Sequence, residues 1–597
     1  MNIDLHYIYE FGSFRLNPRE RLLLRGTMVV PLTPKVFDTL IVLVRNSGHV
    51  VSKDELMREI WPDIHVEEAN LTQNVSLLRK LLDQRDQQHP YIETIPKFGY
   101  RFSADVRKVL ADESAATARE QDAPAAAAQE RPGEQTQAIQ SLAVLPFANA
   151  SADPNAEYLS DGITESIINS LSQLPPLRVM ARSTVFRYKD READPQKVGR
   201  EMGVRAVLMG RLLYLGNKLI IRTELIDVSD GRQIWGEQYT CEPLDILAVQ
   251  AEISREISEK LKLRMSGQQK HLLTKRYTEN TEAYQAYLKG RYYWNKRTEE
   301  GFKKAIEYFR QAIREDPNYA LAYAGLADCY NLLNSYGWLR PTESAPLIKA
   351  AAGQALKIDE ALAEAHTSLG HVKMMHDWDW AGAVREFRRA VELNPNYATA
   401  YHWHALYLRA MGRFDESLAK IRQAQSLDPL SLIINTVVGT HFYYARQYDK
   451  AIAQCRVTLE LDRSFRVAYG VIGAAYTQKG MYKEAVAELR KAISISSGPE
   501  GLAMLGYTYA RAGRRSEAEK ILNRLKKMSD RRYIEPASIA LIYTGLTETE
   551  QAFKWMGKAY QDRNELLLML KVDPRLDALR SDTRFTELLR RIGLHDE

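Results

Sequence analysis

Six residues between positions 70 and 80 carry side chains of the kinds that proteins use to contact DNA: Asn70, Thr72, Gln73, Ser76, Arg79 and Lys80. Short amides and hydroxyls can approach base edges closely, whereas arginine and lysine one turn later can reach phosphates. Leucine or valine at positions 71, 75, 78 and 82 recurs at the spacing of one helix face. This spacing predicts a helix over residues 67–82 with its apolar side turned inward and its polar side exposed.

A predicted hairpin over residues 91–102 supplies a second group of candidate contacts. We expect Lys97 at its tip, and Tyr100 and Arg101 on its returning strand. The two basic side chains carry the charge that binds phosphate. Tyr100 suits either the core of the hairpin or a contact to a base or sugar.

The residues before this helix provide the elements that must hold it. Alternating apolar residues over 7–32 predict a small antiparallel sheet. Thr33 and Pro34 then open a helix, as its cap and its first residue. Ser52 and Glu55 form a capping box that starts a second, short helix. A loop over residues 63–66 leads into the helix over 67–82.

This order of elements, with LTQNVSLLRK at 71–80 and GYRF at 99–102, resembles the winged helix-turn-helix DNA-binding domain of the OmpR/PhoB type. The resemblance covers residues 1–106. It implies that helix 67–82 enters the major groove, that the hairpin is a wing against the backbone or minor groove, and that residues 63–66 face RNA polymerase. We find no receiver domain before the winged helix and no membrane span like that of CadC/ToxR-like relatives.

The charge of this region limits the expected affinity. Residues 1–106 contain 13 Lys and Arg against 14 Asp and Glu, and the whole chain of 597 residues has a net charge of +6. Phosphate contacts supply most of the sequence-independent affinity for DNA. We therefore expect weak binding by a single domain, steep salt dependence, and binding as a tandem or homodimer.

The second half of the chain repeats every 34 residues. Small residues recur in register, for example at Ala405, Gly439 and Gly473. Two antiparallel helices per repeat explain the pattern, because small side chains let helices cross closely. The phasing resembles tetratricopeptide repeats, and roughly eight or nine of them fit residues 270–597 as an all-α solenoid.

In this phasing, five residues are expected on the inner groove of the solenoid: His402, Arg409, Thr436, Tyr443 and Thr477. Such a groove either binds an unknown protein or peptide or stays empty. His402 and His404 do not predict a metal site, since helix residues two positions apart point in different directions.

Residues 107–138 are rich in alanine and predict a flexible linker. Strand-like runs around a helical segment then predict an α/β domain over residues 139–265. Its sequences AVLPFANASADPNAEYLSDGITESIINSLS and LIDVSDGRQIWGEQY resemble the TolB-like N-terminal domain, which brings no catalytic role with it. The predicted fold class is multidomain α+β, with a winged helix, a TolB-like domain and a helical solenoid.

The sequence has none of the phosphate-loop, zinc-protease, nucleophile-elbow or dinucleotide motifs, and its three cysteines form no Cys-x-x-Cys pair. We therefore predict no enzyme activity, cofactor or metal. The predicted function is a cytoplasmic, one-component transcriptional regulator that binds double-stranded DNA and senses a protein or peptide through its repeats. One alternative is an assembly scaffold whose winged helix contacts proteins. Another is a small-molecule sensor in the TolB-like domain.

Overall fold

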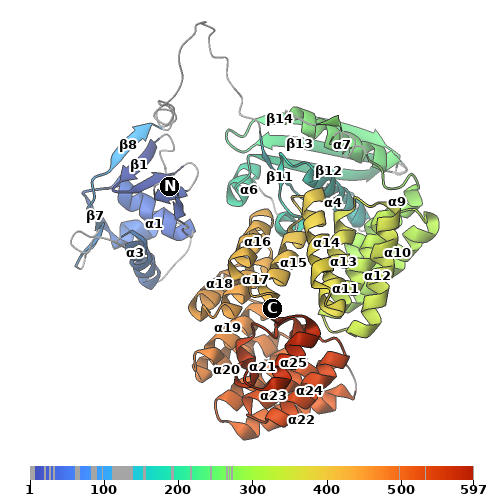
Figure 1. Cartoon of the computed structure of the whole chain (residues 1–597). Helices are drawn as coiled ribbons and strands as arrows, with labels where there is room; N and C mark the ends of the chain where they lie inside the picture. Colours follow the sequence, from blue (N-terminus) through green and yellow to red (C-terminus); the bar gives the residue numbers. More distant parts are fainter. Residues whose placement is uncertain are drawn as a thin grey trace, which may run out of the picture. The chain divides into compact units, whose positions relative to one another are not determined.

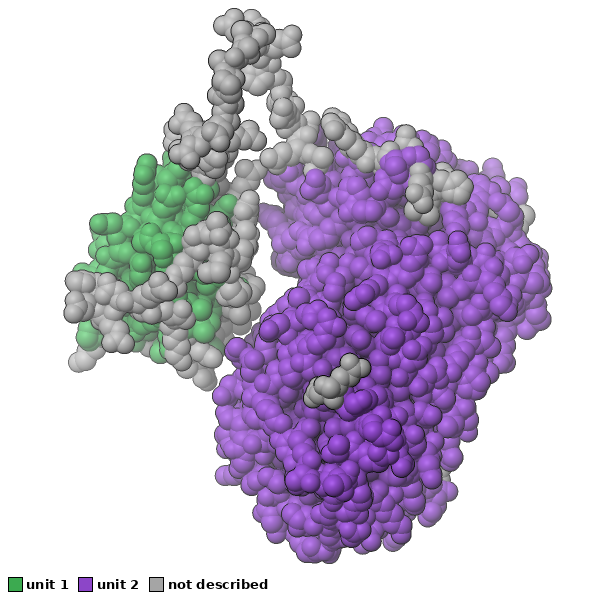
Figure 2. Space-filling view, viewed as in Figure 1, with its two compact units in different colours: residues 1–135 green, residues 136–597 purple. Residues whose placement is uncertain are grey.

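The computed structural model describes residues 7–18, 22–25, 28–30, 32, 34–60, 68–82, 91–96, 98–110, 139–151, 156–189, 194–215, 218–242, 245–261, 263, 266, 267, 269, 273, 275–496, 498–530 and 533–595. The chain divides into two compact units, residues 1–135 and residues 136–597 (Figure 2). The boundary predicted near residues 265–270 lies within the second unit. Residues 111–138 of the predicted linker lie outside the described residues.

Unit 1 contains a five-stranded antiparallel sheet in the order β4-β3-β2-β1-β8. Its first four strands confirm the sheet predicted over residues 7–32. The predicted start of the linker at residue 107 is wrong, because residues 107–110 pair with β1 as a fifth strand. The strands are β1 (Tyr7–Phe11), β2 (Phe14–Asn17), β3 (Leu22–Arg25), β4 (Met28–Val30) and β8 (Arg107–Leu110).

The described part of unit 1 also contains three helices and a second, three-stranded sheet. The capping box is confirmed in part, since the amide of Glu55 donates a 3.2 Å hydrogen bond to Ser52 Oγ. The predicted cap Thr33 lies outside the described residues. The elements are α1 (Pro34–Arg45), α2 (Lys53–Ile60), α3 (Glu68–Leu82), β5 (Val50–Ser52), β6 (Ile92–Ile95) and β7 (Gly99–Phe102), with the sheet in the order β5-β7-β6.

Unit 2 begins with a mixed sheet in the order β11-β9-β12-β13-β14, with β10 beside β12. The first pairings are parallel and the last two antiparallel, and β12 and β13 form a hairpin in which Leu215 pairs with Lys218. Helix α4 packs on β9 to β11, α6 on β12 and β13, and α7 on β14. The elements are β9 (Ser141–Val144), β10 (Ala148–Asn149), α4 (Glu157–Ser172), β11 (Arg178–Val179), α5 (Arg182–Val185), η3 (Phe186–Tyr188), α6 (Pro195–Met202), β12 (Ala206–Leu215), β13 (Lys218–Asp227), β14 (Gln233–Cys241) and α7 (Ile246–Lys260).

Antiparallel helical pairs follow, eight of them within the described residues, and they curve into a solenoid (Figure 1). The predicted small-residue columns lie where helices cross. A Cβ atom on Gly439 would lie 2.4 Å from Cys455 Sγ, and one on Gly473 would lie 2.6 Å from Leu489 Cγ. The pairs are α9 (Thr281–Trp294) with α10 (Glu299–Glu315), α11 (Ala320–Ser335) with α12 (Pro341–Ile358), α13 (Ala363–Val372) with α14 (Trp380–Leu393), α15 (Ala398–Ala410) with α16 (Phe414–Leu427), α17 (Leu432–Tyr444) with α18 (Tyr448–Leu461), α19 (Arg466–Gln478) with α20 (Tyr482–Ile495), α21 (Pro499–Arg511) with α22 (Arg515–Ser529), and α23 (Pro536–Gly545) with α24 (Thr549–Gln561).

After α24 the chain leaves the repeat pattern and turns back against earlier repeats. This C-terminal segment comprises η6 (Glu565–Met569), η7 (Pro574–Leu579) and α25 (Thr583–Ile592). Trp380 Nε1 donates a 2.7 Å hydrogen bond to the carbonyl of Ile592, and Arg446 binds Asp577 through two contacts of 2.6 and 2.8 Å. Figure 1 shows the C-terminus close to the middle repeats.

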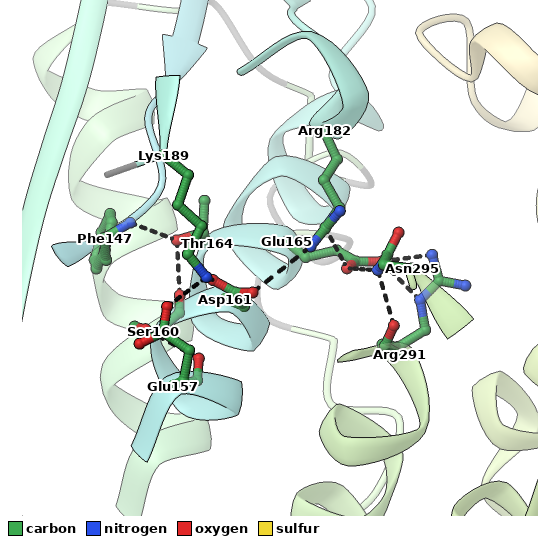
Figure 3. A network of polar contacts seen from close by, with 10 residues as sticks. All are labelled: Phe147, Glu157, Ser160, Asp161, Thr164, Glu165, Arg182, Lys189, Arg291 and Asn295. Carbon is green, nitrogen blue, oxygen red and sulfur yellow. Dashed lines mark hydrogen bonds and ion pairs between the residues drawn. The ribbon is translucent and has the colours of Figure 1, made fainter. Parts of the chain in front are cut away.

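A buried ionic network joins the sheet domain to the first repeats (Figure 3). Glu165 on α4 lies 2.9 Å from Arg182 Nε and 2.5 Å from Arg291 Nη2 on α9. Burial opposes ionisation of Glu165, but the two arginines hold its pKa below the usual value. Asp161 accepts a 2.6 Å hydrogen bond from Lys189, yet burial raises its pKa. Separating the sheet domain from the first repeats would leave Glu165 or Arg291 as an unpaired buried charge, which is costly. The network therefore holds these two parts of unit 2 together.

The edge of the solenoid makes a second, periodic contact with the sheet domain. Asn394, Asp428 and Asp462 follow successive repeats at the 34-residue spacing. Asn394 Nδ2 donates to Ser172 Oγ at 3.1 Å, and Asp428 accepts from Thr184 Oγ1 at 2.7 Å. Beside Asp462, the carbonyl of Leu461 accepts a 2.7 Å hydrogen bond from the Arg187 guanidinium. Residues 172–187 therefore follow the repeat edge.

Candidate nucleic-acid interface

The inner side of α3 is fixed by apolar packing, as predicted. Leu71, Val75, Leu78 and Leu82 are all buried in the core of unit 1. Asn74 adds a polar contact that the sequence analysis missed, because its Nδ2 donates a 3.0 Å hydrogen bond to Thr39 Oγ1 on α1. The rotation of α3 about its axis is therefore set by both kinds of contact.

The outer side of α3 presents three of the predicted polar residues to solvent. Asn70, Thr72 and Ser76 are exposed, whereas the side chains of Gln73 and Lys80 lie outside the described residues. Leu77 is also 41% exposed, although the sequence analysis did not select it. An exposed leucine beside short polar groups suits contact with a thymine methyl group in the major groove.

Arg79 links α3 to the wing. Its Nε donates a 2.9 Å hydrogen bond to the carbonyl of Ile92, and its Nη2 donates a 2.7 Å bond to Thr94 Oγ1, both on β6. The guanidinium is only partly exposed. In this geometry Arg79 positions the wing beside α3 and commits two of its five N–H donors to that role.

Strand β7 fits closely against β5 at the base of the wing. A Cβ atom on Gly99 would lie 2.0 Å from the carbonyl oxygen of Val51, so only glycine fits there. Tyr100 is 4% exposed and belongs to the core. Its predicted DNA contact is therefore wrong, because packing against the core of unit 1 removes its side chain from the surface.

The wing keeps one paired charge and one exposed aromatic ring. Arg101 Nη2 lies 2.5 Å from Glu93 Oε2, and this hydrogen bond holds the pKa of Glu93 below its usual value. Phe98, which the sequence analysis missed, is 63% exposed at the turn before β7. Lys97 and the loop over residues 63–66 lie outside the described part of the chain. An exposed ring at a wing tip suits contact with a sugar or base.

The predicted peptide groove of the solenoid is filled. Tyr443 packs in one buried cluster with Leu568, Met569 and Val572 of the C-terminal segment. Arg409 is 5% exposed, its guanidinium lies 5.1 Å from the ring of Tyr444, and burial lowers its pKa.

The other members of the predicted groove are enclosed to different degrees. Thr436 and Thr477 are buried, and each hydroxyl donates to a carbonyl of its own helix. His402 is half-buried, and burial together with Arg409 lowers its pKa to about 4. Since four of the five residues are buried, the prediction of an open peptide groove at these columns is wrong.

The second histidine of the pair belongs to the packing of the repeats. His404 is buried and stacks on Phe387 with 6.0 Å between ring centroids. No group of three or more histidine, cysteine or carboxylate side chains among the described residues is placed to hold a metal ion. Over the same residues, no helix is long and apolar enough to cross a membrane.

Four family models match separate parts of the chain. Residues 26–102 match the model "Transcriptional regulatory protein, C terminal", and residues 294–337, 379–431 and 467–498 match tetratricopeptide repeats. Residues 137–256 match the second domain of HilA/YgeH-like transcriptional regulators. The predicted TolB-like identity of this segment stays a prediction.

Relatives match over different lengths. The chain is 25% identical over 427 residues to the transcriptional regulator HilA of Salmonella paratyphi A, covering 70% of each chain. It is 33% identical over 100 residues to the transcriptional activator CadC of Escherichia coli, covering 17% of this chain and 20% of CadC. It is also 36% identical over 196 residues to putative adenylate cyclase 3 of Rhizobium meliloti, about a third of either protein. The chain thus carries an OmpR/PhoB-type winged-helix domain and tetratricopeptide repeats, and it is homologous to HilA/CadC-type transcriptional regulators.

Proposed function

We propose that this protein is a sequence-specific, double-stranded-DNA-binding transcriptional regulator, and that the outer face of α3 reads the bases. The exposed, short polar side chains of Asn70, Thr72 and Ser76 carry this proposal. They lie opposite a fully buried apolar stripe, so α3 can enter a groove without losing its own packing.

In this proposal Arg79 and Arg101 act on the wing. Each already has partners inside unit 1, at Ile92 and Thr94 for Arg79 and at Glu93 for Arg101. Arg79 holds the wing beside α3, Arg101 joins the two strands of the wing, and Lys80 and Lys97 remain as the proposed phosphate contacts. Because residues 1–106 contain 13 Lys and Arg against 14 Asp and Glu, one unit 1 binds weakly, and a homodimer or tandem of sites raises the affinity.

Unit 2 is proposed to supply regulation. Its repeats, the edge-bound segment 172–187 and the network around Glu165 make the sheet domain and solenoid one compact body. A protein partner on this body, with RNA polymerase a second candidate partner, would change DNA occupancy in the cytoplasm. We propose no catalytic step for it.

The test selects DNA sequences with the full chain. Random duplexes are first enriched by the parent protein. Fluorescence polarisation then measures the affinity of the parent, Ser76→Glu and Ser13→Glu for the enriched duplexes. Ser13 is exposed in the turn between β1 and β2, so it controls for added charge on the other sheet of unit 1.

A carboxylate at position 76 should weaken binding by more than about 30-fold, because opposed like charges cost several kcal/mol. Ser13→Glu should stay within about threefold of the parent, since its effect is limited to screened, long-range charge. Failure of the full chain to enrich any sequence, or equal losses in the two variants, would contradict the proposal.

The second candidate function is an assembly scaffold whose unit 1 contacts proteins. The internal pairing of Arg79 and Arg101 favours it, because an arginine that already binds groups of unit 1 is less available to a phosphate. Affinity purification after nuclease treatment discriminates the two. A scaffold should retain its protein partners after nuclease treatment and should carry no DNA before it. A regulator should carry genomic fragments before the treatment and lose them after it.

A further inference from the structure

One segment in the last repeats holds the positive surplus of the chain. Residues 511–532 contain nine Lys and Arg against three Asp and Glu, a net charge of +6. The whole chain of 597 residues also has a net charge of +6. The rest of the chain is therefore balanced overall, and a polyanion would find its strongest attraction at this segment of unit 2.

Helix α22 forms most of the described part of this segment, and its two sides differ. Leu522 and Leu525 are buried against neighbouring helices. The opposite side carries Lys520, Arg524 and Lys527, which recur at i, i+4 and i+7 and are all exposed. We call these three residues the basic stripe. None of them forms an ion pair with a residue that the structure describes.

The usual reasons for basic residues on a helix surface do not explain the basic stripe. Basic side chains in the last turn complement the helix dipole, which accounts for Lys527 but not for Lys520 and Arg524 in the middle of α22. A solvated face usually mixes both signs, as on α16 and α18, each with two basic and two acidic residues. Helix α22 has five basic residues and two acidic ones, and those two pair with Arg514 and Arg515.

The neighbouring repeats extend the charge in a second direction. Helices α20, α22 and α24 are equivalent helices of three consecutive repeats. At one equivalent position they carry Lys491, Arg524 and Lys558, each directly before a buried residue. At another, α22 and α24 carry Lys520 and Lys554. All five side chains are exposed, and only Lys491 has a carboxylate partner among the described residues, at 3.1 Å.

The spacing of these charges matches the backbone of double-stranded DNA. Lys520 and Lys527 are seven residues apart, which is about 10 Å along a helix. One strand of B-DNA carries about three phosphates over this length, since its rise is about 3.4 Å per nucleotide. Unpaired ammonium and guanidinium groups gain affinity by releasing the counterions that condense on DNA. The basic stripe thus offers three cations over a length that presents three phosphates.

We propose that the basic stripe, with the cations of α20 and α24 beside it, binds the phosphate backbone of double-stranded DNA independently of base sequence. This goes beyond base reading by α3 and requires no contact from unit 1. It also supplies phosphate contacts that unit 1, with its balanced charge over residues 1–106, is short of. Two DNA-binding surfaces on one chain raise the overall affinity, because the second contact forms at a high effective concentration.

The test measures the affinity of the full-length protein for a labelled duplex of random sequence across a salt series, by fluorescence polarisation. The main variant combines Lys520→Gln, Arg524→Gln and Lys527→Gln, which removes the three charges and keeps polar side chains. We call it the stripe variant. Thermal melting checks that each variant folds.

The matched control removes the same number of charges from scattered positions. It combines Arg314→Gln, Lys357→Gln and Lys450→Gln, which change exposed residues on α10, α12 and α18. None of these three forms an ion pair with a described residue. The control therefore reports the effect of net charge alone.

The stripe variant should bind the random duplex more than about tenfold more weakly than the parent at low salt. The slope of log affinity against log salt should become shallower by about 2–3, because each lost phosphate contact removes about 0.9 from it. The control should stay within about threefold of the parent, since its charges act only through screened, long-range interactions.

Ser76→Glu on α3 separates this proposal from the proposed function. It should weaken binding of a selected duplex far more than binding of the random one. Stripe-dependent binding by a protein that selects no sequence supports the basic stripe and contradicts only the proposed function. Sequence selection with an unchanged salt slope in the stripe variant contradicts only the basic stripe.

Duplex RNA and poly-glutamate of similar length test other polyanions in the same assay. Three results would overturn the proposal. These are no binding of the random duplex by the parent at low salt, equal slopes in the stripe variant and the control, or stripe-dependent binding that is tighter for RNA or poly-glutamate than for DNA. The last result would assign the surface to RNA or to an acidic protein.

Discussion

The outer face of α3 and the inner columns of the solenoid are two sets of polar residues at helix spacing with opposite fates. Around α3, Asn70, Thr72 and Ser76 remain exposed. In the solenoid, Arg409 and Tyr443 are covered by a segment more than a hundred residues further along the chain. Periodicity therefore identifies a face of a helix, but the tertiary structure decides whether that face is available to a partner.

The two regions also treat arginine differently. Arg101 is partly exposed and paired with a carboxylate, whereas Arg409 is enclosed, with the ring of Tyr444 as its neighbour. Arginine on an exposed wing can exchange its partner for a phosphate at little cost. An enclosed arginine cannot do so without moving the segment that covers it. The partly exposed Arg101 can thus change partners, whereas the enclosed Arg409 belongs to the architecture of unit 2.

The largest expected effect tests the filling of the groove. Leu568→Ala should lower the free energy of unfolding by about 2–5 kcal/mol, because it opens a cavity in a buried cluster. Chemical denaturation measures the loss, with the exposed Leu347→Ala as the control. Equal, small effects of the two changes would show that the C-terminal segment is loosely attached and the groove open.

The next effect concerns acid stability of unit 2. Burial lowers the pKa of His371 to about 3, below its usual value of 6.5, so the folded protein keeps this imidazole neutral. Between pH 6.5 and about 3 the unfolded chain takes up the proton first. The contribution of the neutral His371 to the free energy of unfolding is therefore complete above pH 6.5 and is lost as the pH falls.

His371→Gln removes this site but keeps a side chain able to bond Asn331, which now contacts His371 Nδ1 at 2.9 Å. Between pH 6 and 5 the parent should lose up to about 1.4 kcal/mol per pH unit more than the variant. Denaturation curves across this range measure the difference. Parallel pH profiles would show that His371 titrates normally and is open to solvent.

A smaller effect separates positioning from phosphate contact at Arg79. Thr94→Val removes one acceptor of the Arg79 guanidinium and changes no charge. If Arg79 holds the wing, the variant should lose about 1 kcal/mol of stability and bind DNA a few-fold more weakly. DNA affinity equal to or higher than that of the parent would instead assign Arg79 to a phosphate.

The smallest effect tests the charge of the wing. Glu93→Gln leaves Arg101 without its ion-pair partner. Binding to DNA should tighten about two- to threefold, and the slope of log affinity against log salt should steepen by about one phosphate contact. Glu10→Gln, which frees Arg15 on the other sheet, is the control. An unchanged slope in Glu93→Gln would place Arg101 away from DNA.

Local patterns predicted most of the elements, because the forces that form them are local. The stripe at 71, 75, 78 and 82 predicted α3 and its buried side, and the 34-residue spacing predicted the helical pairs. Strand β8 was missed because its partner, β1, lies about a hundred residues earlier in the chain. Its four residues carry no alternation long enough to indicate a strand.

The candidate site was predicted in outline, and its errors arose from tertiary contacts. Tyr100 satisfied both a core and a surface interpretation, and only packing against unit 1 distinguishes them. Phe98 was overlooked because an aromatic residue in a hairpin ordinarily suggests burial. The partners of Arg79 lie on a strand that follows an intervening loop, so no spacing rule connects them.

Photocrosslinking from position 76 tests the central claim most directly. A photoreactive amino acid replaces Ser76 in one full-length protein and Ser13 in another, and each is irradiated with a duplex selected by the parent. Contact between α3 and the bases predicts crosslinks to defined bases from position 76 and none from position 13. Crosslinks absent at 76, or equally frequent and unselective at both positions, would contradict the assignment of α3 as the reading helix.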